Sequence, residues 1–214
     1  MTLVLTGGPS AGKTALAQLL LKEFNNRVAI VPETASILFY GGFPRGQTDN
    51  EVRHQQRAIY YVQRELEEMI AETHSKKLIV CDRGTLDGLA YWPGSRDEFF
   101  KSLNTSLHDE LKRYDFVIHL VSAGPAAYDY RNPMRIESAS RASRLDEKIQ
   151  EIWSQHPNRY LIHNSQQFSK KLEAAIAIVE LILKRTSIAG TNPKLEPSLI
   201  KQQEGYPSTR PHTH

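Results

Sequence analysis

The segment GGPSAGKT at residues 7–14 matches the spacing G-x-x-x-x-G-K-[ST] of a phosphate-binding loop without a mismatch. It consists of Gly7, Gly8, Pro9, Ser10, Ala11, Gly12, Lys13 and Thr14. An apolar run typical of a buried strand, residues 2–6, precedes it, and a helical pattern, residues 13–24, follows. Strand, loop and helix in this order favour a phosphate-binding loop over a chance glycine-rich turn.

The residue types in this loop suit the binding of a nucleoside triphosphate. Glycines let the backbone turn so that successive N–H groups converge on phosphate oxygens. The helix that follows adds the positive end of its dipole. We expect Lys13 to contact the β- and γ-phosphates of ATP, with GTP as an alternative, and the hydroxyl of Thr14 to bind Mg²⁺.

Short apolar runs alternate with longer helical patterns along most of the chain. The runs predict strands buried on both faces, at residues 2–6, 27–31, 78–82, 116–121 and 160–163. Helical patterns cover residues 13–24, 50–73 and 168–184. The alternation predicts an α/β fold with a parallel sheet between helices.

An acidic residue, Asp82, ends the third predicted strand and is followed directly by Arg83. This is where P-loop proteins place the carboxylate that acts at the metal ion, so we expect Asp82 to hold Mg²⁺ or to orient an attacking hydroxyl. Arg83 would contact an anionic substrate or the transferring phosphoryl group. The alternative is a solvated acid that caps the segment after Gly84.

A second carboxylate, Glu33, lies just beyond the second predicted strand. Ligands of open α/β sheets bind at the carboxyl ends of the strands, so Glu33 and Asp82 are predicted to face the same site. One would hold the metal while the other accepts a proton from a substrate hydroxyl. The alternative for Glu33 is an acid that favours the start of a helix.

Four arginines follow the fourth predicted strand, and irregular sequence surrounds the first of them. Arg131 and Arg135, nearest this irregular stretch, are interpreted as catalytic, because arginine forks neutralise charge on a transferring phosphoryl group. For Arg141 and Arg144 two interpretations fit equally well: the same catalytic role, or a solvated basic helix face shared with Lys148. A loop that closes over the phosphates would also exclude water.

Several other polar or aromatic side chains carry weaker signals. His119 stands within a predicted strand and is interpreted as a packed histidine rather than a ligand. Four aromatic residues are interpreted as core rather than as walls of a substrate pocket: Tyr60, Tyr61, Tyr91 and Trp92. Three glutamines on the long predicted helix are interpreted as solvated rather than as contacts to a base or sugar: Gln55, Gln56 and Gln63.

Length and composition suit a single globular domain. The formal net charge of +3 is too small to argue for nucleic acid as a partner. Cys81 is the only cysteine, which excludes an internal disulfide and fits a reducing compartment. There is no apolar run of about 18 residues and no basic start of a signal peptide, so we expect a cytoplasmic protein.

The composition changes after Arg185. Residues 187–214 contain four prolines and few large apolar side chains, so they bury too little surface to offset the entropy of ordering. We therefore predict a nucleotide-binding domain at 1–186 and a disordered tail at 187–214. A partner-binding arm is the alternative for the tail.

The motifs together resemble those of a known family. GGPSAGKT, VPETAS, VCDRGTLDGLAYWP, YDFVIHL and NPMRIESASRASRLDEKIQEIWSQHP, spread over residues 1 to about 180, are similar to the short AAA-type ATP-binding domain proteins, relatives of the ribosylnicotinamide kinase domain and of thymidylate kinases. The resemblance implies a P-loop NTPase fold whose five parallel strands lie in the order 2-3-1-4-5, and a lid at about 122–144. It also places Asp82 and Arg83 at the phosphoryl-transfer site. Gly84 departs from the aromatic residue that thymidylate kinases carry there.

These observations favour a phosphotransferase that moves the γ-phosphoryl group of ATP to a small nucleoside- or nucleotide-like acceptor. The alternatives are a plain ATPase and a nucleotide-dependent switch whose lid is read by a protein partner. A Ras-like form of the switch is disfavoured, because the sequence has neither an N-K-x-D nor a D-x-x-G motif. Neither the acceptor nor the oligomeric state follows from the sequence.

Overall fold

The computed structural model describes residues 1–122, 139–164 and 167–189. Its centre is a sheet of five parallel strands in the order β2-β3-β1-β4-β5. The strands are β1 (Thr2–Thr6), β2 (Val28–Val31), β3 (Leu78–Asp82), β4 (Phe116–Leu120) and β5 (Arg159–Ile162). Both the parallel sheet and the strand order implied by the resemblance are confirmed, and each strand end lies within one residue of its prediction.

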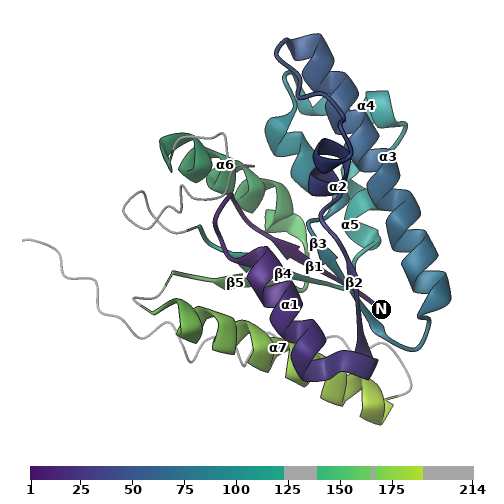
Figure 1. Cartoon of the computed structure of the whole chain (residues 1–214), viewed down its shortest axis with the longest axis vertical. Helices are drawn as coiled ribbons and strands as arrows, with labels where there is room; N and C mark the ends of the chain where they lie inside the picture. Colours follow the sequence, from purple (N-terminus) through teal and green to yellow (C-terminus); the bar gives the residue numbers. More distant parts are fainter. Residues whose placement is uncertain (123–138, 165–166, 190–214) are drawn as a thin grey trace, which may run out of the picture.

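Helices cover both faces of this sheet (Figure 1). Side chains of β1 alternate between the two faces, because successive residues of a strand point in opposite directions. Leu3 and Leu5 pack with α1 (Lys13–Phe24) and α7 (Phe168–Ala189). Val4 packs on the other face with α3 (Asp49–Thr73), α4 (Arg96–Leu103) and α6 (Ala139–Ile152).

Three short helices were not predicted from periodicity. These are α2 (Thr34–Tyr40), α5 (Leu107–Lys112) and α4. The start of α4 could have been predicted from the spacing of Ser95 and Glu98, which form a capping box. The Ser95 hydroxyl accepts from the Glu98 N–H while the Glu98 carboxylate accepts from the Ser95 N–H. Short 3₁₀ turns at Asn25–Arg27, Thr85–Tyr91 and Trp153–Gln155 complete the described elements.

The last helix is longer than the sequence pattern predicts. α7 ends at Ala189 rather than at residue 184. It therefore includes the first three residues of the segment 187–214 that was predicted to be a tail. The rest of that segment, 190–214, lies outside the described residues, and so do Arg131 and Arg135.

Parallel strands bring the residues that follow them to one edge of the sheet. β1 leads into the phosphate-binding loop, β2 into Glu33, β3 into Arg83 and β4 into Ser122. β1, β3 and β4 are buried along almost their whole length, so this edge has a rigid base. The candidate site is built on it.

Candidate functional site

The loop at residues 7–14 turns sharply between β1 and α1. Gly7 has φ 129°, and a Cβ there would stand 2.1 Å from the carbonyl oxygen of Leu120 in β4. Gly12, with φ 99°, precedes the first residue of α1 in a left-handed conformation. Both positions therefore require glycine, one because of a close approach and the other because of its backbone angle. These are two of the glycines that define the motif.

The ammonium group of Lys13 lies inside this loop. It donates to the carbonyl oxygens of Gly7 and Gly8, each at 2.9 Å. Burial, followed by repulsion from Arg83, lowers the pKa of Lys13 to about 8. An ammonium group has three N–H donors, so these two contacts leave one that can bind an anionic phosphate oxygen.

Thr14 and Asp82 join the loop to β3. The Thr14 hydroxyl donates to Oδ2 of Asp82 at 2.8 Å. The other carboxylate oxygen, Oδ1, is buried and has no hydrogen-bond partner among the described residues, and burial raises the pKa of Asp82. An unpaired carboxylate oxygen beside a hydroxyl fits Mg²⁺, which takes one or two carboxylates and completes its shell with phosphates and water. The described residues include no group of three or more His, Cys, Asp or Glu side chains that could hold a metal ion. A magnesium ion here would therefore need phosphate and water ligands as well.

Glu33 and Arg83 form an ion pair across the ends of β2 and β3. Arg83 Nε donates to Glu33 Oε1 at 2.5 Å, and the Ser36 hydroxyl donates to Oε2 at the same distance. Burial raises the pKa of Glu33, but Arg83 and Lys13 outweigh it and lower the pKa to about 2. Glu33 is therefore ionised at neutral pH, and its two oxygens are already oriented.

Arg83 is held in an uncommon conformation. Its φ is 82°, in the region that disfavours residues with a side chain. Besides Glu33, its guanidinium contacts Asp87 at 3.3 Å. Asp87 is itself buried and accepts from the Thr6 hydroxyl and from the Trp153 indole N–H. The surroundings thus fix the guanidinium at the site although the backbone is strained there.

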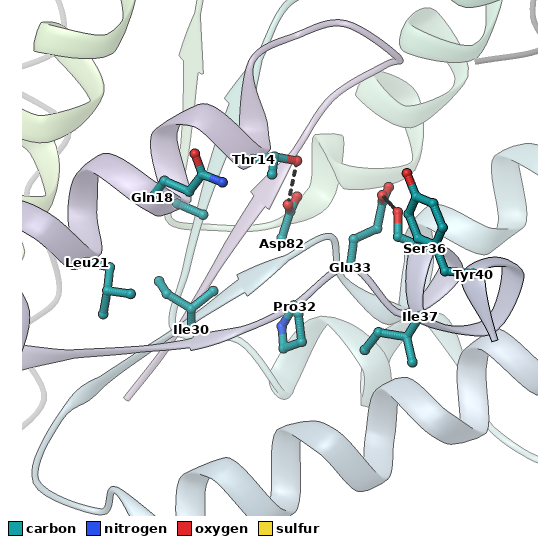
Figure 2. A pocket seen from close by; sticks show the side chains of 11 residues that line it. Thr14, Gln18, Leu21, Ile30, Pro32, Glu33, Ser36, Ile37, Tyr40 and Asp82 are labelled. Atoms are coloured by element: carbon teal, nitrogen blue, oxygen red, sulfur yellow. Dashed lines mark hydrogen bonds between the residues drawn. The ribbon is translucent and has the colours of Figure 1, made fainter. Parts of the chain in front are cut away.

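A cavity of about 360 Å³ opens beside these two pairs (Figure 2). Figure 2 shows the Thr14–Asp82 contact at its upper edge and the Glu33–Ser36 contact beside Tyr40. The remaining lining residues are Ala17, Gln18, Leu21, Ile30, Pro32 and Ile37. Glu33 and Asp82 therefore face one cavity, as their places after two neighbouring strands predict.

The structure separates the arginines that follow β4. Arg141 and Arg144 lie in α6, where both side chains are exposed. Exposure fits a solvated helix face, which was one of the two interpretations. Arg131 and Arg135 fall outside the described residues, so their catalytic role stays a prediction.

Some interpretations of single residues need correction. Gln56 and Gln63 are buried in α3 rather than solvated. Gln63 accepts from the Thr34 hydroxyl and donates to Glu67 and to the carbonyl of Arg83, so it supports the backbone at the site. Tyr61 is half exposed rather than core. His119 is packed as predicted, being fully buried in β4.

Gly84 is explained by a neighbour in space. A Cβ at this position would stand 2.7 Å from the Trp153 ring, which comes from the turn after α6 and is fully buried. The indole thus occupies the space next to the backbone at residue 84. This accounts for the absence of an aromatic side chain directly after the acid–arginine pair.

Sequence reasoning missed two charged residues that contact the phosphate-binding loop. Asp146 of α6 accepts from the Gly8 N–H, and Lys171 of α7 donates to the Ala11 carbonyl. Their partners are backbone groups 138 and 160 positions away, which no local pattern reveals. The one signal is that each is a charged residue at a buried position of its helix, and burial is known only from the folded structure.

Comparisons with known proteins agree with this architecture. A family model described as an AAA domain matches residues 2–171. A thymidylate kinase from Ehrlichia chaffeensis is among the similar solved structures, with a TM-score of 0.56 and 17% sequence identity over 84% of this chain and 98% of that chain. At that identity the likeness shows the fold. The search of curated proteins gives no match. None of the helices in the described ranges is both long and apolar enough to span a bilayer.

Proposed function

Because the chain belongs to the AAA domain family of P-loop proteins, we propose that it is a Mg²⁺-dependent phosphotransferase, which moves the γ-phosphoryl group of ATP, or of GTP, to a small hydroxyl-bearing acceptor. One observation carries the proposal. The Thr14–Asp82 contact and the Glu33–Arg83 ion pair line the same edge of the sheet, beside one cavity. A loop built only to hold nucleotide has no need of the second pair.

The donor side consists of the loop and the end of β3. Lys13 and loop N–H groups, from Gly7, Ser10, Ala11 and Gly12, would bind the phosphates, while Pro9 and Gly8, whose N–H is bound by Asp146, shape the turn. Thr14 and Asp82 would hold Mg²⁺, which neutralises charge on the β- and γ-phosphates when bound. The unpaired Oδ1 of buried Asp82 supports this assignment.

The acceptor side consists of Glu33 and Arg83. Glu33 would accept a hydrogen bond from the acceptor hydroxyl and orient its oxygen toward the γ-phosphorus. The new O–P bond forms as the bond to the β-phosphate oxygen breaks, and the hydroxyl proton passes to a carboxylate, with ADP as the leaving group. A pKa of about 2 makes Glu33 a weak base, which suffices because positioning dominates phosphoryl transfer. Asp82, whose pKa is raised, is the alternative proton acceptor.

Arginine side chains would neutralise charge on the transferring group. Arg83 is already at the site, held by Glu33 and Asp87. Its guanidinium presents several N–H donors in one plane, which suits phosphoryl oxygens. Arg131 and Arg135 are proposed to complete this charge from the segment that follows β4.

The walls of the cavity favour an acceptor with an uncharged body. Its apolar side chains come from α1, β2 and α2, and its polar lining consists of carboxylates, hydroxyls and one amide. Among the described lining residues there is no lysine or arginine. Arg83 adjoins this lining through Glu33, but its guanidinium is already paired with two carboxylates, so a nucleoside-like alcohol fits this wall better than a nucleotide.

A nucleotide-dependent switch is the second candidate. Leu21, Ile37 and Tyr40 surround the outer part of the cavity and are 46%, 43% and 72% exposed. Exposed apolar side chains next to a phosphate site would let a protein partner sense the bound nucleotide. The switch predicts tight nucleotide binding without turnover that depends on a small acceptor.

An acceptor screen separates these functions. Purified protein with Mg·ATP, and in parallel with Mg·GTP, is given matched pairs of nucleosides and their monophosphates, and similar neutral alcohols. Release of nucleoside diphosphate and the mass of the product are recorded. Acceptor-stimulated turnover with a product heavier by one phosphoryl group supports the kinase. Tight binding without stimulation supports the switch, and diphosphate release without any phosphorylated product supports a plain ATPase.

A further inference from the structure

Two buried side chains of opposite charge contact the phosphate-binding loop from outside. Asp146 lies in α6 and Lys171 in the first turns of α7, and they are only 3% and 2% exposed. Burying a charge costs stability unless it is well paired. The partners of these two charges therefore decide what they can do for the loop.

In the described part of the chain, the hydrogen-bond partners of the Asp146 carboxylate are all N–H groups. Its Oδ1 accepts from the Gly8 N–H at 2.6 Å and from His119 Nε2 at 3.1 Å. Its Oδ2 accepts from the Ser122 N–H at 3.0 Å and from the Gln150 amide at 3.4 Å. Burial raises the pKa of this carboxyl, but the hydrogen bonds from His119, Ser122 and Gly8 outweigh it and lower the pKa.

The Lys171 ammonium makes the complementary contacts. It donates to the carbonyl of Ala11 at 2.9 Å and to the carbonyl of Val121 at 2.5 Å. Each of the two charged side chains thus joins the phosphate-binding loop to the residues directly after β4. The Ser122 hydroxyl adds a third link, because it donates to the carbonyl of Pro9 at 3.1 Å.

These contacts set the direction of two peptide groups in the loop. A trans peptide is planar, so its N–H and C=O point in opposite directions. In the Gly7–Gly8 peptide, Asp146 binds the N–H while the C=O on the other side accepts from Lys13. In the Ala11–Gly12 peptide, Lys171 binds the C=O, so the Gly12 N–H faces away from Lys171.

We propose that Asp146 and Lys171 are positioning residues for the triphosphate. They hold the two peptide groups in the orientation that phosphate binding needs, and Asp146 acts on Lys13 through the Gly7–Gly8 peptide. Fixing these groups before the ligand arrives lowers the entropic cost of binding. The inference rests on nucleotide binding by the loop and does not depend on phosphoryl transfer.

Two substitutions test this role, each with a matched control. Asp146→Asn places an NH₂ group against N–H donors, and Lys171→Met keeps the length of the side chain without its charge. The controls are the exposed neighbours Glu147→Gln and Lys170→Met. Affinities for Mg·ATP, Mg·GTP and Mg·tripolyphosphate, which has no base, are measured by calorimetry below the melting temperature of each variant. We expect both test variants to bind about tenfold more weakly to all three, and the controls to bind normally.

A double-mutant cycle separates positioning from general destabilisation. If Asp146 acts through Lys13, Asp146→Asn has little further effect on tripolyphosphate affinity in a Lys13→Ala background, whereas independent effects would add. If Asp146→Asn does not fold, Lys171→Gln, which keeps a donor toward the Ala11 carbonyl, tests the positioning role without the cycle, and a partial loss of affinity for all three probes is then expected.

Two outcomes would overturn the proposal in different ways. Additive effects, or normal affinity in folded variants, would remove the positioning role while nucleotide binding stands. Failure of the parent protein to bind any of the three probes would remove nucleotide binding, and the positioning role with it.

Discussion

Arg83 Nε contacts Glu33 Oε1 at 2.5 Å, which ties the residue after β3 to the loop after β2. The two residues are 50 positions apart in the chain and come from neighbouring strands. Their pairing keeps Glu33 charged and also uses one of its oxygens. An acceptor hydroxyl therefore meets a carboxylate and a guanidinium as one unit.

Replacing Glu33 with Gln tests this unit. The change keeps the shape and removes the charge, so we expect phosphoryl transfer to slow by roughly 10²–10⁴-fold while Mg·ATP affinity stays near normal. Single-turnover transfer and calorimetry check this. Ser36→Ala is the control, because it removes one hydrogen bond to Glu33 but leaves the charge, and a small effect is expected. Unaltered transfer in Glu33→Gln would leave Asp82 as the only candidate base.

Asp82→Asn should also lose turnover, but for a different reason from Glu33→Gln. Its carboxylate shares the proposed metal site with Thr14, so the variant should lose the gain in nucleotide affinity that Mg²⁺ gives and should shift the Mg²⁺ dependence of turnover. Titrating ATP with Mg²⁺ and with EDTA measures that gain. Thr14→Ser, which keeps a hydroxyl, should retain most of it. An Asp82→Asn protein with the parent's response to Mg²⁺ would place the metal elsewhere.

Lys13→Ala should weaken triphosphate binding far more than nucleoside binding, because the lysine charge acts at the β- and γ-phosphates. Without ligand the pKa of Lys13 is about 8, lowered by burial. Phosphate favours the protonated form, so binding at pH 8–9 should take up a proton, and affinity should fall as the pH rises through 8. Calorimetry in two buffers of different ionisation enthalpy measures the uptake. Equal Mg·ATP affinity in parent and variant would contradict this.

Gly84→Ala should lower the free energy of unfolding by about 1–3 kcal/mol, the usual cost of overpacking a core. The new methyl group would press on the buried Trp153 ring at 2.7 Å. Gly88→Ala is the matched control, because its nearest neighbour is a side-chain terminus, the Gln56 amide oxygen, at the longer distance of 3.1 Å. Urea denaturation compares the two. Equal stability of both variants would mean that the indole moves aside freely.

Removing residues 190–214 should leave nucleotide affinity and melting temperature nearly unchanged. The composition of this segment supports the expectation, since few of its side chains could add to a core. The truncation is made after Ala189 because α7 ends there. A fall of several degrees in the melting temperature would indicate that the segment docks on the domain.

The parts of the site at the ends of strands could be predicted from sequence. The parts that come from the buried faces of helices could not. Glu33 and Asp82 were paired correctly because the carboxyl ends of parallel strands always meet at one edge. Gln63 was judged solvated because a glutamine on a helix usually is. It is buried because Thr34 and the carbonyl of Arg83 converge on it from distant segments. Contacts between such distant segments produce no periodic pattern in the sequence, so they could not be predicted from it.

Helix length also limited the prediction. α2, α4 and α5 have 7, 8 and 6 residues, too few for a clear period. The extra length of α7 was missed for another reason. The proposed end followed the last large apolar residues, although the helix continues for five residues beyond Lys184.

The contacts of Asp146 and Lys171 have a consequence for how the protein is made on the ribosome. The loop at residues 7–14 is synthesised first, but the side chains that fix its peptide groups arrive more than 130 residues later. β4 and its partner β5 are also late. A nascent chain that ends before α7 has emerged therefore carries the complete motif without Lys171, and one that ends before α6 lacks Asp146 as well. Chains of increasing length, stalled on ribosomes and probed with labelled ATP, should reach full nucleotide affinity only once residue 171 has left the exit tunnel.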